Sequence, residues 1–270
     1  MDFQHSWNIY RKDWKTSVKR KEVLGVMIFL PAIMGIGMPI LMLIGILVDP
    51  TGFLESFGDP DLLKILYNIP PHYNDALAAA TIMMKMFVLP MFLFIPVLLP
   101  VIISSDSFAG EKERKTMESL LYLPITKTEL LIGKVLASFL PSMIISVSIF
   151  FVMGIVVNIM FIPHLAGNLL LFGDLTAMLI GLLMSPSWAL LNIQIGVIIS
   201  SRARDLKSAQ SIGGALITPV LGIFFIAIFS PTFLNIITVL IISGGLLILW
   251  IIFVYIGNRV LDPEKLIVLA

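Results

Sequence analysis

The chain has 270 residues, of which 58% are hydrophobic and 13% are charged, and its mean hydropathy is +1.02. A soluble domain carries roughly 25% charged residues, so this composition excludes a soluble protein and indicates an integral membrane protein. The net charge of +1 gives no reason to expect nucleic acid as a partner. The chain has no cysteine, which excludes disulfides, thiolate metal sites and cysteine nucleophiles.

The first segment, residues 1–22, is polar and basic, with aromatic and aliphatic side chains interleaved among lysines and arginines. This pattern predicts an amphipathic helix that lies on membrane lipid at the cytoplasmic face, ahead of a membrane domain at residues 23–270. A signal peptide is the alternative. The apolar run that follows, residues 23–48, is too long for a signal peptide and has no small-residue cleavage site, so it is predicted to be the first span.

The apolar pattern predicts an all-α membrane protein with six transmembrane helices. Each apolar stretch is long enough to cross a bilayer, and the stretches are residues 23–48, 76–105, 135–161, 175–200, 211–229 and 233–257. The second is expected to be kinked or locally unwound, because it contains Pro90, Pro96 and Pro100. Residues 49–75 are predicted to be a mixed outer loop with a short interfacial helix at residues 61–67.

The orientation follows from the distribution of positive charge. All but two of the 18 lysines and arginines lie at the termini, in residues 106–134 or in residues 200–210. The two exceptions are Lys64 and Lys85. Cytoplasmic loops carry the excess of basic residues, so six spans with both termini in the cytoplasm are predicted, in the cell membrane.

The central polar stretch, residues 106–134, is predicted to contain two helices separated by Pro124. Oppositely charged side chains stand four residues apart in the first helix, where helical side chains meet; the pairs are Glu111 with Lys115 and Arg114 with Glu118. An apolar stripe follows at the spacing of one helix face, formed by Met117, Leu120 and Leu121. Pro124 ends this helix because it lacks an amide proton.

The second helix of the loop is predicted to begin at Thr126. Thr126 is placed to cap the helix, and Glu129, three residues on, completes a capping box. The two helices together give the loop a defined shape between the second and third spans. A solvated, salt-bridged loop without a partner is the simpler interpretation of the same stretch.

The order of residues in this loop resembles the signature loop of type 2 ATP-binding-cassette (ABC) transporter permeases. In that family acidic, basic and acidic residues precede a Thr, an apolar residue and a Glu, followed by two leucines, a Pro, a Glu and Gly-Lys. The matching residues are Glu111, Lys112, Glu113, Thr116, Met117, Glu118, Leu120, Leu121, Pro124, Glu129, Gly133 and Lys134. Lys115 replaces a frequent Gly, which should stiffen the helix. A weaker resemblance follows at Ser200, Ser201, Arg202, Ala209 and Gln210.

The resemblance implies the permease subunit of an ATP-driven exporter. It implies that ATP and Mg are bound by a separate cytoplasmic ABC ATPase subunit, present in two copies, and that two permease copies pair as a homodimer. The helix at residues 111–121 then becomes a coupling helix. The docking residues that it implies are Glu111, Glu113, Arg114, Thr116, Met117, Glu118, Leu120, Leu121 and Pro124.

The chain itself has no sequence for nucleotide hydrolysis. The pattern G-x-x-x-x-G-K-[ST], which cradles phosphates, does not occur, since Val135 follows Gly133 and Lys134. No catalytic residue, metal site or cofactor is therefore expected in this chain. None of the three histidines has a metal-ligand partner at a meaningful spacing.

Two other functional classes remain as alternatives, a secondary carrier and a membrane enzyme or assembly scaffold without ATP coupling. The carrier is disfavoured because the spans lack a relay of buried Asp, Glu or His. The enzyme is disfavoured because no acid, base or nucleophile pair is placed together at one membrane face.

Few polar residues are candidates for a translocation pathway. They are Asn158, Asn192, Gln194 and Thr218. Hydrogen bonding between helices is the alternative role for all four. A mostly apolar lining would suit a lipophilic cargo. Lys85 is expected near the outer interface, where it can extend toward water or act as a counter-ion for a substrate.

Overall fold

The computed structural model describes residues 6–12, 14, 21–114, 126–165, 167–203, 205–230 and 232–260. These described residues contain helices and no strand. Six segments are long and apolar enough to cross a membrane; they are Met27–Val48, Asp75–Gly110, Thr128–Met160, Leu175–Arg202, Leu206–Phe229 and Ile236–Gly257. The predicted all-α fold with six membrane-spanning helices is therefore confirmed.

The first span and the segment after it form one side of the bundle. The span consists of α2 (Lys21–Ala32), a π-helical turn η1 (Ile33–Gly37) and α3 (Met38–Val48). Two short helices, α4 (Pro50–Phe57) and α5 (Pro60–Leu66), follow it. Each begins with an aspartate cap and a proline, because a proline in the first turn loses no hydrogen bond there. The predicted mixed loop is thus largely helical.

The second span is the most buried of the six and is interrupted several times. Its parts are α6 (Asp75–Met83), η2 (Met84–Val88), α7 (Leu89–Phe92), α8 (Ile95–Ser105) and η3 (Asp106–Gly110). A turn at residues 93–94 separates α7 from α8. These irregularities accompany the three prolines, each of which removes an amide donor from the helix.

The third span is part of one continuous helix, α11 (Lys127–Met160), which begins eight residues before the predicted start of the span. A short η4 (Ile162–His164) and an irregular segment lead to the fourth span, made of α12 (Leu175–Leu179), η5 (Ile180–Met184) and α13 (Ser185–Arg202). The loop predicted at residues 200–210 is mostly helical, because α14 (Leu206–Gly214) begins four residues after α13 ends.

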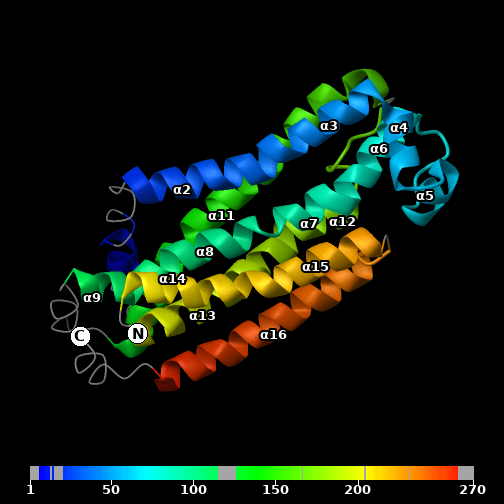
Figure 1. Ribbon diagram of the computed structural model, residues 1–270. Coiled ribbons are helices and arrows are strands. Elements are labelled where there is room, and N and C mark those ends of the chain that lie inside the picture. The colour runs from blue at the N-terminus through cyan, green and yellow to red at the C-terminus, as the bar shows by residue number, and fades with distance from the viewer. Residues whose placement is uncertain are drawn as a thin grey trace.

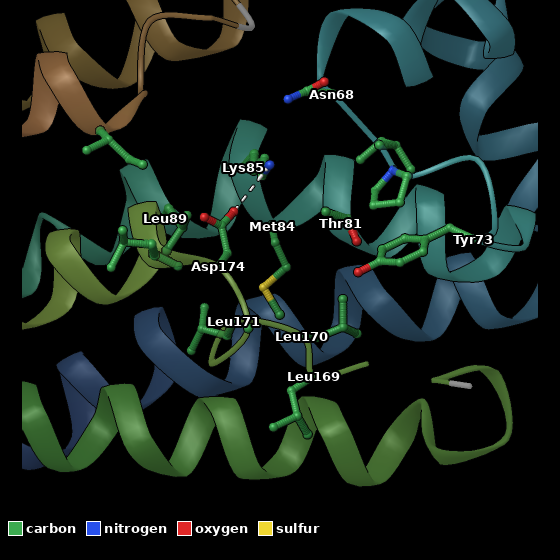
Figure 2. A pocket seen from close by; sticks show the side chains of 16 residues that line it. Asn68, Tyr73, Thr81, Met84, Lys85, Leu89, Leu169, Leu170, Leu171 and Asp174 are labelled. Atoms are coloured by element: carbon green, nitrogen blue, oxygen red, sulfur yellow. Dashed lines mark ion pairs between the residues drawn. The ribbon is translucent and has the colours of Figure 1, made fainter. Parts of the chain in front are cut away.

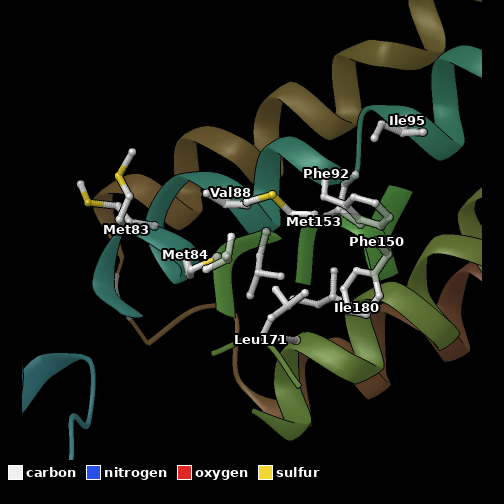
Figure 3. Packing of buried hydrophobic residues seen from close by; sticks show 14 of the residues in the cluster. Met83, Met84, Val88, Phe92, Ile95, Phe150, Met153, Leu171 and Ile180 are labelled. Carbon is white, nitrogen blue, oxygen red and sulfur yellow. The ribbon is translucent and has the colours of Figure 1, made fainter. Parts of the chain in front are cut away.

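The last two spans complete the bundle. The fifth runs through α14, η6 (Ala215–Ile217) and α15 (Thr218–Phe229), and the sixth is α16 (Ile236–Val260). Helix α13 packs against α8, α11 and α16, so it lies at the centre of the bundle. Figure 3 shows Phe92, Phe150 and Ile180 packed together in the core, and the rings of Phe92 and Phe150 are 5.4 Å apart at their centroids.

The bundle has two distinct ends (Figure 1). We call the end that carries α9 (Glu111–Glu113) and the starts of α11 and α14 the loop end. The opposite end, which carries α4 and α5, is the cap end. Among the described lysines and arginines, all except Lys64 and Lys85 belong to segments at the loop end.

Candidate functional site

The loop end contains a buried carboxylate held between two lysines. Glu111, at the start of α9, lies 3.0 Å from the Nζ of Lys134 in α11 and 3.0 Å from the Nζ of Lys12 in the N-terminal helix. The side chains of Glu111 and Lys134 are 5% and 0% exposed, whereas that of Lys12 is 48% exposed. Lys134 is 23 positions and Lys12 is 99 positions from Glu111 in the chain, so the cluster connects three distant segments.

The surroundings of Glu111 favour its ionised form. Burial alone would raise the pKa of its carboxyl group, but the charges and hydrogen bonds of Lys134 and Lys12 outweigh burial and lower the pKa below its ordinary value of 4.5. The Nζ of Lys134 also lies 4.6 Å from the centre of the Phe108 ring, a cation–π contact. The base of the loop is therefore fixed by paired charges in the protein interior.

A second set of contacts joins the end of the second span to the fourth span. The backbone amides of Phe108 and Ala109 donate to the Oγ of Ser200, at 3.0 and 2.9 Å. That hydroxyl donates to the carbonyl of Ser105, at 2.7 Å. Phe108 and Ala109 belong to the π-helical turn η3. The Ser200 side chain of α13 completes their hydrogen bonding at this irregular turn. These hydrogen bonds link η3 directly to α13.

The N-terminal helix, residues 6–12, packs against the start of α11. Ile9 is 4% exposed and joins an apolar cluster with Phe108, Leu130, Leu131, Ile193 and Val197. The Ser6 Oγ donates to the carbonyl of Glu129, at 3.0 Å. Gly133 allows this close approach, since a Cβ there would lie 2.8 Å from the Cβ of Ile9. One face of this helix is thus buried on the protein, while Trp7 on another face is 43% exposed.

Helix α14 is tied to the same end. The Glu113 carboxylate accepts a hydrogen bond from the amide of Leu206, at 2.9 Å. Asp205 caps α14 by accepting from the amide of Ser208, at 2.6 Å. Glu113 and Asp205 are both acidic groups at a helix N-terminus, where the unpaired amides favour negative charge. The start of the fifth span is therefore linked to α9.

The start of α11 has the two hydrogen bonds of a capping box. Thr126 Oγ1 accepts from the amide of Glu129, at 3.3 Å, and Glu129 Oε2 accepts from the amide of Thr126, at 3.0 Å. Glu129 is buried while Thr126 is exposed. The pair defines the residue at which the chain leaves the loop and enters the third span.

The predicted docking residues that the structure describes differ in their exposure. The sequence assigns Glu111 to the docking surface, whereas its carboxylate is in the interior and is paired with two lysines of this chain. Glu113 is exposed, and Arg114 is partly exposed. The other predicted docking residues lie outside the described residues; they are Thr116, Met117, Glu118, Leu120, Leu121 and Pro124.

The four predicted pathway residues have different surroundings in the structure. Asn158 forms hydrogen bonds with the backbone of Leu170 and Gly154. Asn192 is buried and donates to the carbonyl of Trp188, one turn earlier in its own helix. Gln194 is buried and donates to the carbonyl of Phe253, at 3.5 Å. Thr218 is exposed.

A pocket of about 320 Å³ opens at the cap end, where Lys85 of η2 meets Asp174 (Figure 2). The Lys85 Nζ and an Asp174 carboxylate oxygen are 3.2 Å apart. The sequence placed Lys85 near this interface but did not identify Asp174 as its partner, because the two residues are far apart in the chain. Asp174 also caps α12 by accepting from the amide of Thr176, at 2.8 Å. An aspartate at a helix start is a local pattern, so the sequence could have identified Asp174 as a helix cap.

No group of three or more potential metal ligands occurs among the described residues. The site therefore consists of ion pairs, helix caps and apolar contacts at the base of a loop. Such an arrangement can position a loop and transmit its movement to several spans. It offers no arrangement of groups for covalent chemistry among the residues named above.

Comparison with protein families gives a match over most of the chain. The model of the ABC-2 family transporter protein matches residues 7–245, from the N-terminal helix into α16. The chain belongs to this family. Comparison with curated proteins and with solved structures gave no match. As an ABC-2 family protein, the chain is a multi-pass membrane component of a transporter, and membership implies an ABC ATPase as its partner.

Proposed function

We propose that this ABC-2 family protein is the permease subunit of an ATP-driven exporter in the cell membrane. In this proposal residues 106–134 contact a separate cytoplasmic ATPase subunit, which binds ATP and Mg. The observation that carries the proposal is the buried Glu111, held by Lys12 and Lys134. It fixes the base of the loop to the N-terminal helix and to the third span, as a force-transmitting element requires.

The burial of Glu111 is the basis for assigning different roles to different residues of the loop. Glu111 positions the loop, because its carboxylate is enclosed by the protein and paired. Contact with the ATPase is assigned to the apolar stripe of Met117, Leu120 and Leu121 and to Glu118 beside it. Glu113 and Arg114 lie between these two parts, and Glu113 links the loop to α14.

Movement of the loop would reach the membrane by three routes. The continuous helix α11 leads from Thr126 into the third span. The η3 turn leads into α8 of the second span, and Ser200 links η3 to α13. Rigid helices and hydrogen-bond networks are physical carriers of coupling between sites. ATP-driven closure of two ATPase copies would therefore move a pair of permeases, proposed to be a homodimer.

The charge distribution supports a cytoplasmic loop end. Nearly all described basic residues lie at that end, as the positive-inside rule requires of cytoplasmic segments. An apolar bundle with few charged side chains at membrane depth suits a lipophilic cargo, which export would move to the outer side.

The proposal is tested by isolating the tagged full-length chain from its native membranes. A co-purifying protein should carry the G-x-x-x-x-G-K-[ST] sequence and hydrolyse ATP. Leu120→Asp should abolish co-purification while membrane insertion stays normal, because a charge in an apolar contact is costly to desolvate. The matched control is Leu62→Asp, an exposed leucine at the cap end, which should retain the ATPase.

Two results would overturn the proposal. One is a purified chain that transports without any nucleotide-hydrolysing partner. The other is equal ATPase recovery with Leu120→Asp and with wild type, which would remove the loop from the contact.

A further inference from the structure

The pocket at the cap end has the size and lining of a ligand site. Its volume of about 320 Å³ falls at the lower end of the range for small-molecule sites. Most lining side chains are apolar, and the two charged ones, Lys85 and Asp174, form an ion pair with each other. The apolar lining comes from Ile69, Pro70, Met84, Leu89, Leu169, Leu170, Leu171, Leu175, Ala177 and Ile236. Figure 2 shows Met84 and Leu171 on the side of the pocket facing away from Asn68.

The walls of the pocket are held in place from outside it. Asn158 of α11 accepts from the amide of Leu170 and donates to its carbonyl, at 3.0 and 2.8 Å. This clamp fixes the segment that carries Leu171, whose φ of +64° lies in the left-handed region. Asp174 is fixed in turn by its hydrogen bond from the Thr176 amide. The ion pair and the apolar wall are thus pre-organised relative to each other.

Part of the exposed lining of the pocket is apolar. Three lining residues are among the exposed hydrophobic side chains, Leu169 at 55%, Leu175 at 60% and Ile236 at 40%. They lie where the fourth and sixth spans begin at the cap end, near the expected membrane surface. An acyl chain can therefore enter from the lipid along these exposed apolar side chains.

The ion pair decides which head group fits. Lys85 and Asp174 are about one quarter exposed, so each charge is only partly solvated. A head group with one charge would be attracted by one member and repelled by the other, only 3.2 Å away. A head group with both charges can place its ammonium on Asp174 and its anion on Lys85, so that neighbouring charges alternate in sign. Of the three N–H donors of Lys85, one serves Asp174 and one the Tyr67 carbonyl at 3.4 Å, which leaves one for the anion of the ligand. The Asp174 carboxylate has spare lone pairs for the ammonium.

We propose that the cap-end pocket binds a zwitterionic amphiphile, with the ammonium on Asp174, the anionic group on Lys85 and the acyl chain along Met84, Leu89 and Leu171. The binding site is a property of this chain alone and does not depend on ATP coupling. Its test therefore separates it from the proposed function.

The test titrates the purified full-length chain in maltoside micelles and measures bound amphiphile by native mass spectrometry. The probes are lysophosphatidylethanolamine, which carries both charges, lysophosphatidylglycerol, which is anionic, and dodecylamine, which is cationic. O-phosphoethanolamine, which has the head group and no tail, measures the role of the chain. We expect the zwitterionic lysolipid to bind at least about tenfold more tightly than the other three.

Two variants reverse the preference instead of only weakening it. Lys85→Gln leaves Asp174 and should make dodecylamine the tightest ligand, whereas Asp174→Asn leaves Lys85 and should favour lysophosphatidylglycerol. A misfolded variant would lose all binding and could not show opposite preferences. The matched control is Lys64→Gln, which removes another ion pair at the cap end, 2.8 Å from Asp75 and outside the pocket lining. It should bind as wild type does.

Three outcomes would overturn the inference. The first is equal binding of the three amphiphiles by wild type. The second is a preference that neither pocket variant changes. The third is tight binding of O-phosphoethanolamine, which would show that the acyl chain and the apolar wall contribute nothing.

Discussion

At the scale of single residues, the loop end depends on Glu111. Its carboxylate faces both Lys134, whose side chain is fully buried, and Lys12 on the N-terminal helix. Pairing makes the burial of Lys134 tolerable, since an isolated buried ammonium is costly. Glu111 thus positions the loop by stabilising the fold at its base.

Glu111→Gln should lower the free energy of unfolding by about 3 kcal/mol at neutral pH, because it removes a carboxylate charge that lies 3.0 Å from the fully buried Lys134 ammonium. Denaturant titration in mild detergent measures this loss. The control is Glu55→Gln, an exposed carboxylate in α4, which should change stability by no more than about 0.5 kcal/mol. Equal effects of the two substitutions would contradict the role of Glu111.

The pH dependence of the same pair has a definite sign. The pKa of Glu111 is lowered in the folded protein, so its contribution to stability is present above the ordinary value of 4.5 and is lost as pH falls through the lower folded value. The stability gap between wild type and Glu111→Gln should therefore narrow below pH 4.5. A gap that is unchanged at lower pH would show that the charge of Glu111 is not its cause.

At the scale of elements, the start of α11 is where several segments meet. The capping box defines its first turn, and Gly133 in its second turn receives the N-terminal helix. A helix whose entry is fixed in this way transmits displacement along its length and does not absorb it at a flexible joint. This makes the first two turns of α11 the part most sensitive to substitution.

Thr126→Ala should destabilise the chain by about 1 kcal/mol, because the amide of Glu129 loses its side-chain acceptor. The loss should be accompanied by faster hydrogen exchange at Glu129, measured by mass spectrometry. Thr128→Ala, at an exposed threonine in the same turn, is the matched control. Identical exchange in both variants would mean that the cap does not hold this turn.

Gly133→Leu should detach the N-terminal helix at a cost of about 1–3 kcal/mol, since the new side chain meets Ile9 and the Ser6 carbonyl. Faster amide exchange at residues 6–12 reports the detachment. Gly45→Leu is the control, because a Cβ at Gly45 has no neighbour within 4 Å. Unchanged exchange in Gly133→Leu would show that the contact does not hold the helix.

Local patterns predicted more of these elements than of their contacts. Hydropathy indicated the six spans, and the spacing of Thr126 and Glu129 indicated the cap of α11. Helix α4 was missed, although Asp49 followed by Pro50 is a typical helix start. The partners of Glu111 could not be found from spacing, because they lie 23 and 99 residues away. The pairing of Lys85 with Asp174 was missed for the same reason.

At the scale of the whole molecule, the two ends of the bundle differ in composition and in contacts. The loop end gathers basic residues, buried charges and the linked starts of α11 and α14. The cap end has two short helices and the pocket whose lining includes the ion pair of Lys85 and Asp174. The central claim is that the loop end faces the cytoplasm and that residues 106–134 contact an ATPase there.

The absence of cysteine from the chain makes that claim directly measurable, because single cysteines can be introduced without background. The decisive measurement is labelling and crosslinking of Glu118→Cys in intact cells, with Asp61→Cys at the cap end as its counterpart. We predict that an impermeant maleimide labels only Asp61→Cys, and that Glu118→Cys crosslinks to an ATP-hydrolysing partner. Labelling of Glu118→Cys from outside, without a crosslink to such a partner, would contradict it.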